Sequence, residues 1–102
     1  MSLTSKKRAF LRKRAHNLEP IFRIGKEGFS ETLAQGVLEA LIPRELIKVK
    51  ILQNSEADKN EVAYQIAEMI EAEVVGIIGR TIIFYKENQD KPTISLELKA
   101  VK

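Results

Sequence analysis

The chain has no cysteine and a single histidine, and these two shortages exclude several classes of site. Without cysteine it can form neither a disulfide nor a thiolate metal site, and a reducing compartment is permitted. His16 alone cannot build a histidine metal site or a catalytic dyad. The sequence contains no Walker or Rossmann fingerprint, and solvation accounts for its helical carboxylates. We therefore expect no enzyme, no catalytic residue, no metal and no cofactor.

Long apolar runs are also lacking. The longest late run, Val74 to Ile78, is far too short to span a membrane, and no apolar stretch follows the basic N-terminal residues as it would in a secretory leader. A length of 102 residues, with 44% hydrophobic and 30% charged residues, is typical of one globular domain. We expect a cytoplasmic protein that is a monomer when free.

Acidic residues are scarce in the first 26 residues, where eight basic side chains accompany the single acid Glu19 and give a net charge of +7. The remaining nine bases and thirteen acids give −4, so the overall charge of +3 is polarised along the chain. The basic segment runs into the loop 25–28, which has glycine at both ends. Such a segment suits a polyanion with a phosphate backbone, because cations displace its counterions while backbone N–H groups approach phosphate oxygens.

Two helices are predicted in the first half of the chain. The first covers roughly residues 5 to 18, begins after the N-cap Thr4 and stops before Pro20. The second begins after the N-cap Ser30 and ends where Pro43 bars continuation. Their apolar faces follow the helical period: Leu11, Ala15 and Leu18 in the first, and Leu33, Val37, Ala40 and Leu41 in the second.

A third helix and a hairpin are predicted in the second half. Asp58 caps the helix, and Glu61 occupies the reciprocal position of a capping box. Two β-rich runs, 74–78 and 81–86, are separated by Gly79 and Arg80 and form an antiparallel hairpin. The buried stripe of the helix consists of Val62, Ala63, Ile66, Ala67, Met69 and Ile70.

Two more strands, over residues 21–24 and 47–51, complete an α-β-α-β-α-β-β order, which predicts an α/β sandwich with a four-stranded mixed sheet. The first two strands should be parallel through a right-handed crossover, while their spatial order stays open. Loop 25–28 then lies between a strand end and a helix N-terminus, where open α/β sheets bind ligands. The tail 87–102 alternates apolar and polar residues late in its course, so an added edge strand, a partner-binding segment and a disordered tail all remain open.

Several short motifs follow one another in a fixed order: Leu3-Thr4, Lys6-Lys7-Arg8, Leu11-Arg12, Ala15-His16, Leu18, Pro20, Ile24-Gly25-Lys26-Glu27-Gly28, Leu46-Ile47-Lys48-Val49-Lys50, Ile78-Gly79-Arg80-Thr81 and Tyr85. As an ordered set over residues 3–86 they resemble the CRM domain, the chloroplast RNA splicing and ribosome maturation module. The resemblance implies that residues 1–86 form an RNA-binding domain and that residues 87–102 lie outside the common core. It also implies a fold similar to the C-terminal domain of translation initiation factor three.

A free-standing domain of this size resembles the bacterial YhbY-like members of that family, which associate with precursors of the large ribosomal subunit. The resemblance further implies that the G-x-x-G loop is similar to the phosphate clamp of KH domains. Charge, loop position and resemblance together predict an RNA-binding set, which consists of Lys6, Lys7, Arg8, Arg12, Lys13, Arg14, His16, Arg23, Gly25, Lys26, Glu27, Gly28, Lys48, Lys50 and Arg80.

Each part of this set has a structural alternative. The two glycines would serve only the turn, the basic helix would be a solvated face, and His16 would be an ordinary surface residue. Lys48 and Lys50 would be an exposed sheet face or charges that guard an edge strand. Glu27 places an anion in the loop, so its side chain must point to solvent or cap the helix start. The alternative function is a protein-interaction module that docks an acidic partner through its basic face.

Overall fold

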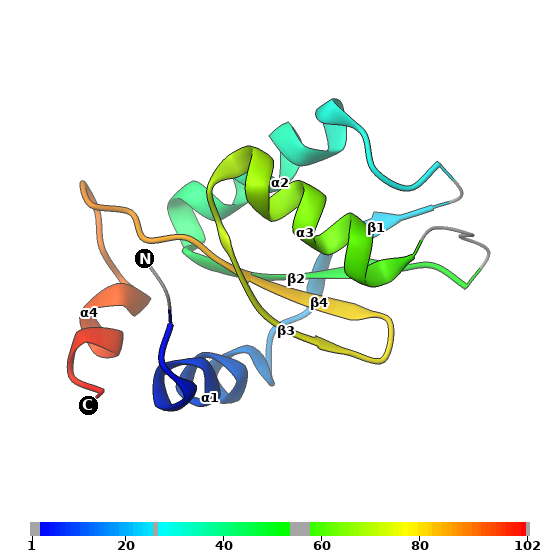
Figure 1. Cartoon of the computed structure of the whole chain (residues 1–102). Helices are drawn as coiled ribbons and strands as arrows, with labels where there is room; N and C mark the ends of the chain where they lie inside the picture. The colour runs from blue at the N-terminus through cyan, green and yellow to red at the C-terminus, as the bar shows by residue number, and fades with distance from the viewer. Residues whose placement is uncertain (1–2, 26, 54–57, 102) are drawn as a thin grey trace.

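A computed structural model describes residues 3–25, 27–53 and 58–101 of the chain (Figure 1). The predicted order of three helices and four strands is confirmed, and a further short helix follows them. None of the helices in these three ranges is both long and apolar enough to cross a membrane. The elements are α1 (Ser5–Ala15), β1 (Pro20–Ile24), α2 (Glu31–Arg44), β2 (Leu46–Ile51), α3 (Lys59–Ile70), β3 (Glu73–Ile78), β4 (Thr81–Tyr85) and α4 (Ile94–Lys99).

The four strands form one mixed sheet in the order β1-β2-β4-β3. β1 and β2 are parallel, with α2 as their crossover, whereas β4 pairs antiparallel with both β2 and β3. The predicted parallel pairing of the first two strands and the antiparallel hairpin are therefore confirmed. The spatial order shows in addition that β1 and β3 are the edges of the sheet.

Helices cover both faces of this sheet. Figure 1 shows α2 and α3 on one face and α1 with α4 on the other. The first face is packed by alternate strand residues such as Val49, Ile82 and Phe84, and the second by Leu46, Ile83 and Tyr85. Period-two alternation thus gives each helix layer its own apolar cluster, and all of these strand residues are buried.

The predicted N-caps are confirmed. The side-chain oxygens of Thr4 and Ser30 accept from the backbone N–H three residues on, at 3.1 Å and 3.0 Å, and Asp58 accepts from two N–H groups of α3. Gly36 inside α2 also has a packing reason, since a Cβ there would lie 3.3 Å from the ring of Phe22. Glycine lowers the helix propensity at this position, but it leaves room for the ring of Phe22 of β1 to approach the helix.

Three details of the predicted helices are wrong. α1 ends at Ala15, because the following turn tightens to three-residue hydrogen bonds, and Leu18 is left 37% exposed. α2 continues through Pro43 to Arg44, since a proline in the last turn removes one helix bond only, and the Arg44 guanidinium donates to a carbonyl of that turn, Ala40 O, at 3.2 Å. Met69, assigned to the buried stripe of α3, is 49% exposed.

The tail is not an edge strand. Its residues Ile94–Lys99 form α4, in which Ile94 and Leu98 pack into the same apolar cluster as α1 while Leu96 is exposed. The tail is held by Glu45, a fully buried glutamate at the C-cap of α2 with a left-handed φ of 65°. Its two carboxylate oxygens accept five hydrogen bonds of 2.7 to 2.9 Å from the backbone and hydroxyl groups of Asn88, Thr93 and Ser95.

Candidate nucleic-acid interface

The basic side chains of α1 divide into groups with different surroundings. Lys6 and Lys13, seven residues apart and on one helical face, are exposed on the side away from the buried Leu11 and Ala15. Arg14 instead points toward α4, where its guanidinium lies 3.3 Å from the carboxylate of Glu97. The structure therefore separates Arg14 from the outward-facing cations with which the sequence groups it.

α1 also begins with cations. Lys6 and Lys7 lie in its first turn, which contains no acidic residue. A helix N-terminus carries partial positive charge, and each cation there costs about 0.3 to 1 kcal/mol at low ionic strength. This arrangement opposes stability and concentrates positive potential, as a binding surface for an anion requires.

Two contacts fix α1 on the sheet. A Cβ built on Gly76 of β3 would lie 3.4 Å from Cδ of Arg12, so the aliphatic stem of this arginine lies over the glycine. At the C-cap of the same helix end, the ammonium of Lys48 donates to the carbonyl of His16 at 3.2 Å. Lys48 is half-buried, and its ammonium pairs with a carbonyl at the C-terminus of α1, where a cation is favourable. This contact supports a structural role for Lys48 in place of RNA binding. The His16 side chain remains exposed.

The glycine loop forms a tight turn before α2. The N–H of Gly28 donates to the carbonyl of Gly25 at 3.2 Å, and Gly28 has a φ of 68°. This N–H is therefore used inside the turn. The side-chain oxygen of Ser30 accepts from the N–H of Leu33. The N–H groups of Glu31 and Thr32, also in the first turn of α2, have no acceptor inside the helix.

A shallow hollow of 290 Å³ lies against this turn, lined by Arg23, Ile24, Gly25, Glu27, Gly28, Ser30 and Leu33. The side chain of Glu27 is exposed, and Glu31 adds a second acid in the first turn of α2. Lys26, the central cation of the predicted clamp, lies outside the described residues. The hollow has the helix N-terminus and one arginine that a phosphate needs, together with two acids that oppose it.

Strand register places the remaining predicted cations at the end of the sheet where the glycine loop lies. Arg23 of β1 is opposite Lys50 of β2, and both are exposed. Arg80, in the β3–β4 turn, donates to the carbonyl of Leu52 at 3.4 Å, just past the end of β2. Lys59 of α3 donates to the carbonyl of Gly79 at 2.7 Å and fixes this turn against the helix layer. β1 runs from the end of α1 to the glycine loop (Figure 1), and Arg23 belongs to this strand with Lys50 opposite it. The two cations therefore lie between these two parts of the predicted site.

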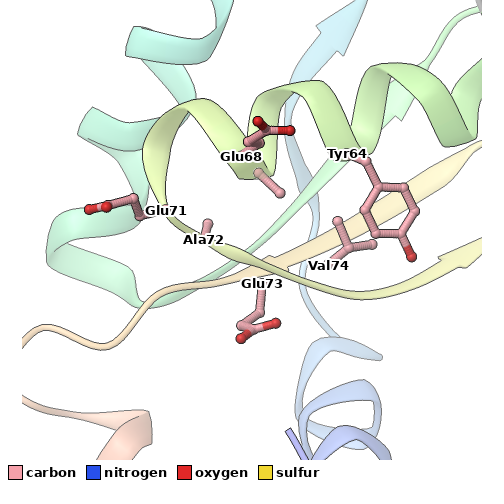
Figure 2. Close-up of a pocket in the computed structure, with 7 residues that line it drawn as sticks. Tyr64, Glu68, Glu71, Ala72, Glu73 and Val74 are labelled. Atoms are coloured by element: carbon pink, nitrogen blue, oxygen red, sulfur yellow. The ribbon is translucent and has the colours of Figure 1, made fainter. Parts of the chain in front are cut away.

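Three glutamates gather at the opposite end of the sheet, where the ammonium of Lys86 also donates to the carbonyl of Glu71 at 3.1 Å. A pocket of 420 Å³ lies between the C-terminal end of α3 and the start of β3, and Figure 2 shows Glu68, Glu71 and Glu73 around it with Tyr64. Glu73 is opposite Tyr85, five positions along β3 from Ile78 at the basic end. A polyanion is repelled here and attracted at the other end. Among the described residues, no three acidic or histidine side chains are grouped so that they could hold a metal ion.

Sequence reasoning did not single out the buried Glu45 or the exposed side chain of Ile78, which is 61% accessible. Ile78 follows the apolar pattern of its strand, so the pattern gives no sign that it is exposed. The left-handed C-cap position of Glu45 favours glycine or asparagine, so no local pattern indicates a glutamate there.

Two known proteins are similar to this chain over most of its length. The chain is 46% identical over 94 residues to the Bacillus subtilis protein named "Probable RNA-binding protein YqeI", covering 92% of this chain and 98% of that protein. It is 39% identical to "Probable RNA-binding protein MJ0652" of Methanocaldococcus jannaschii, covering 85% of this chain and 66% of the relative.

A solved structure shares the fold. The solution structure of the Staphylococcus aureus protein SAV1595 is 42% identical and superposes with a TM-score of 0.72, covering 90% of this chain and 100% of that one. The model of the CRS1/YhbY (CRM) domain family matches residues 3–86, from the residue before the Thr4 cap to the end of the sheet. The predicted resemblance is confirmed, and the chain belongs to the CRS1/YhbY (CRM) domain family.

Proposed function

We propose that this protein binds ribosomal RNA of large-subunit precursors in the cytoplasm, as a single copy, and assists their assembly. The observation that carries RNA binding is the gathering of α1, Arg23, Lys50, Arg80 and the glycine loop on one side of a molecule with three glutamates at its opposite end. Two relatives have RNA-binding in their names. The role needs binding and no bond-making step.

The affinity should come mainly from phosphate contacts. Outward-facing cations of α1 neutralise backbone phosphates, and Arg23 and Lys50 continue the track toward the glycine loop. If four to six cations take part, the logarithm of the binding constant falls against the logarithm of salt concentration with a slope of about −3 to −5. The loop contributes through the start of α2 and Lys26, rather than through the N–H of Gly28, which the turn uses.

A precursor of the large subunit fits these properties. Phosphate contacts position a protein without reading sequence, so a small backbone-binding domain gains specificity from a target that is abundant, structured and exposed only for a time. Immature ribosomal RNA meets all three conditions. The protein would leave when later assembly buries its site.

Sedimentation of a charge-reversed variant tests the proposal. We expect the parent protein to co-sediment with large-subunit precursors and to be stripped off by moderate salt. Lys6→Glu with Lys13→Glu reverses two exposed charges without touching the Arg14–Glu97 pair or the Arg12 stem, and it should weaken RNA binding at least about tenfold and flatten the salt slope by about 2. Lys91→Glu, an exposed charge of the tail, is the matched control and should change neither.

Two results would overturn the proposal. If the parent stays at the top of a low-salt gradient, it does not bind the particle. If it distributes equally between precursors and mature subunits, it is not an assembly factor. Binding to an acidic polypeptide with the same salt slope as to RNA would favour the protein-interaction module instead.

A further inference from the structure

One transverse row of side chains crosses the whole sheet on the face that carries α1. Arg23 is opposite Lys50, Lys50 is opposite Thr81, and Thr81 is opposite Ile78. Directly paired residues project to the same face, so one side chain from each of the four strands lies in this row. At a strand spacing of about 4.8 Å, the row is about 14 Å long.

α1 covers the neighbouring rows but not this one. Gly76 lies under Arg12, and Leu46, Ile83 and Tyr85 belong to the apolar cluster beneath the helix. The Arg23, Lys50 and Ile78 side chains are exposed and Thr81 is half-buried. The sheet therefore presents an open strip between the end of α1 and the loops at its basic end.

The strip is cationic on β1 and β2 and apolar on the β3 edge. Ile78 on the β3 edge is 61% exposed. Arg23 on the β1 edge is opposite Lys50, and Ile21, two residues before Arg23 on the same strand, is 41% exposed. Arg80 follows Ile78 in the β3–β4 turn. An exposed isoleucine contributes little apolar burial to folding, so the side chain of Ile78 is available for contact with a ligand.

We propose that this strip holds unpaired nucleotides of the RNA, with Ile78 against the face of a base and Arg23 and Lys50 on the flanking phosphates. The inference rests on the proposed function and specifies the RNA as a duplex joined to an unpaired segment. A base offers an apolar face for an isoleucine and lies next to a phosphate for a lysine, so the strip matches a splayed strand in both respects.

A duplex alone does not match the strip. Its outer surface consists of phosphates and riboses, and its base faces are stacked inside. Ile78 pressed against a duplex backbone would desolvate phosphates and gain no apolar contact. The helix α1 and the strip therefore suit different parts of one RNA, the first a regularly phosphorylated backbone and the second its unpaired extension.

The test compares a blunt RNA duplex with the same duplex carrying a short unpaired extension. We expect the parent to bind the extended RNA about three- to tenfold more tightly, and Ile78→Ser to lose that preference while the salt slope is unchanged, because an apolar contact releases no counterions. Lys50→Ala should flatten the salt slope by about 1 unit. Leu96→Ser is the matched control, since Leu96 is also aliphatic and 58% exposed, on α4, and it should keep the preference.

Ile78→Thr provides a second variant, because threonine retains the branched β-carbon that favours a strand. It should also lose the preference. Equal binding of the two RNAs by the parent, or an undiminished preference in both folded Ile78 variants, would overturn the inference and leave the proposed function standing. Failure of the parent to bind either RNA would overturn both.

Discussion

Replacing Glu45 by glutamine should release the C-terminal tail from the body of the protein. The carboxylate of Glu45 accepts from the N–H groups of Asn88, Thr93 and Ser95 and from the hydroxyls of Thr93 and Ser95. A glutamine amide keeps one acceptor oxygen and turns the other position into a donor. That donor would face the Asn88 N–H and Ser95 hydroxyl and leave buried groups unpaired.

The magnitude follows from the pKa of Glu45. Burial alone would raise this pKa, but the hydrogen bonds from Asn88, Ser95 and Thr93 outweigh burial and lower it from 4.5 to about 2. A difference of about 2.5 pKa units corresponds to about 3 kcal/mol of stability at neutral pH. We expect the glutamine variant to lose about this amount, first as opening of residues 87–101.

The pH dependence has a definite sign. Because the folded-state pKa is below the unfolded value, the stabilisation by Glu45 is complete above about pH 4.5 and is lost as the pH falls toward about 2. The free energy of unfolding of the parent should fall as the pH drops from about 4.5 to about 2. The decline should be smaller in Glu45→Gln by about 3 kcal/mol. Burial and the charges of Glu45 and Glu87 raise the pKa of Tyr85 to about 12, so the variant should also titrate this tyrosine at lower pH.

Denaturant unfolding across pH and amide hydrogen exchange at Asn88, Thr93 and Ser95 measure these effects. The control is Glu71→Gln, because Glu71 is likewise a glutamate at a helix C-cap with a left-handed φ of 57°, but its side chain is exposed. That variant should stay within about 0.5 kcal/mol of the parent. If both glutamine variants lose equal stability, or if exchange in the tail is unchanged in Glu45→Gln, the buried carboxylate does not hold the tail.

Three further predictions concern the candidate interface. Gly28→Val places a β-branched residue at a φ of 68°, which costs about 1 to 2 kcal/mol and should weaken RNA binding in protein that circular dichroism shows to be folded; undiminished affinity would remove the turn from the site. Glu27→Gln should raise RNA affinity about two- to fivefold in low-salt titrations, with the gain disappearing at high salt, and an unchanged affinity would mean that phosphate stays away from the loop. Lys48→Met should lower thermal stability by about 1 kcal/mol through its lost bond to the end of α1 while changing the RNA salt slope less than Lys50→Ala does; the reverse ranking would make Lys48 a phosphate contact.

The order of helices and strands in the first 86 residues could be predicted from the sequence because local and tertiary preferences agree there. Capping residues mark the starts of α1, α2 and α3, and period-two alternation in β2 assigns Val49 to one layer and Leu46 to the other. Strand order could not be read in the same way. Alternation tells which face a residue occupies, but not which strand lies beside it.

The sequence left the structure of the tail open because its apolar pattern fits both a strand and a helix. Ile94, Leu96 and Leu98 alternate as in a strand, yet Ile94 and Leu98 are also four residues apart as in a helix. A carboxylate almost fifty residues earlier decides between the two, because Glu45 accepts from Thr93 and Ser95 at the start of the helix. The same dependence on distant partners explains Arg14 and Lys48, whose charges the sequence reveals but whose contacts with Glu97 and His16 it does not.

Strand register adds cations from the second half of the chain to the basic end of the molecule. Lys50 and Arg80 come from the part of the chain that is net negative. Pairing with β1 places Lys50 opposite Arg23, and the β3–β4 turn brings Arg80 to the carbonyl of Leu52 at the same end of the sheet. The same hairpin places Glu73 at the far end of its strand, near Glu68 and Glu71. A chain with a net charge of only +3 therefore has an oriented field, which can align the molecule with the basic end toward a polyanion before any specific contact forms.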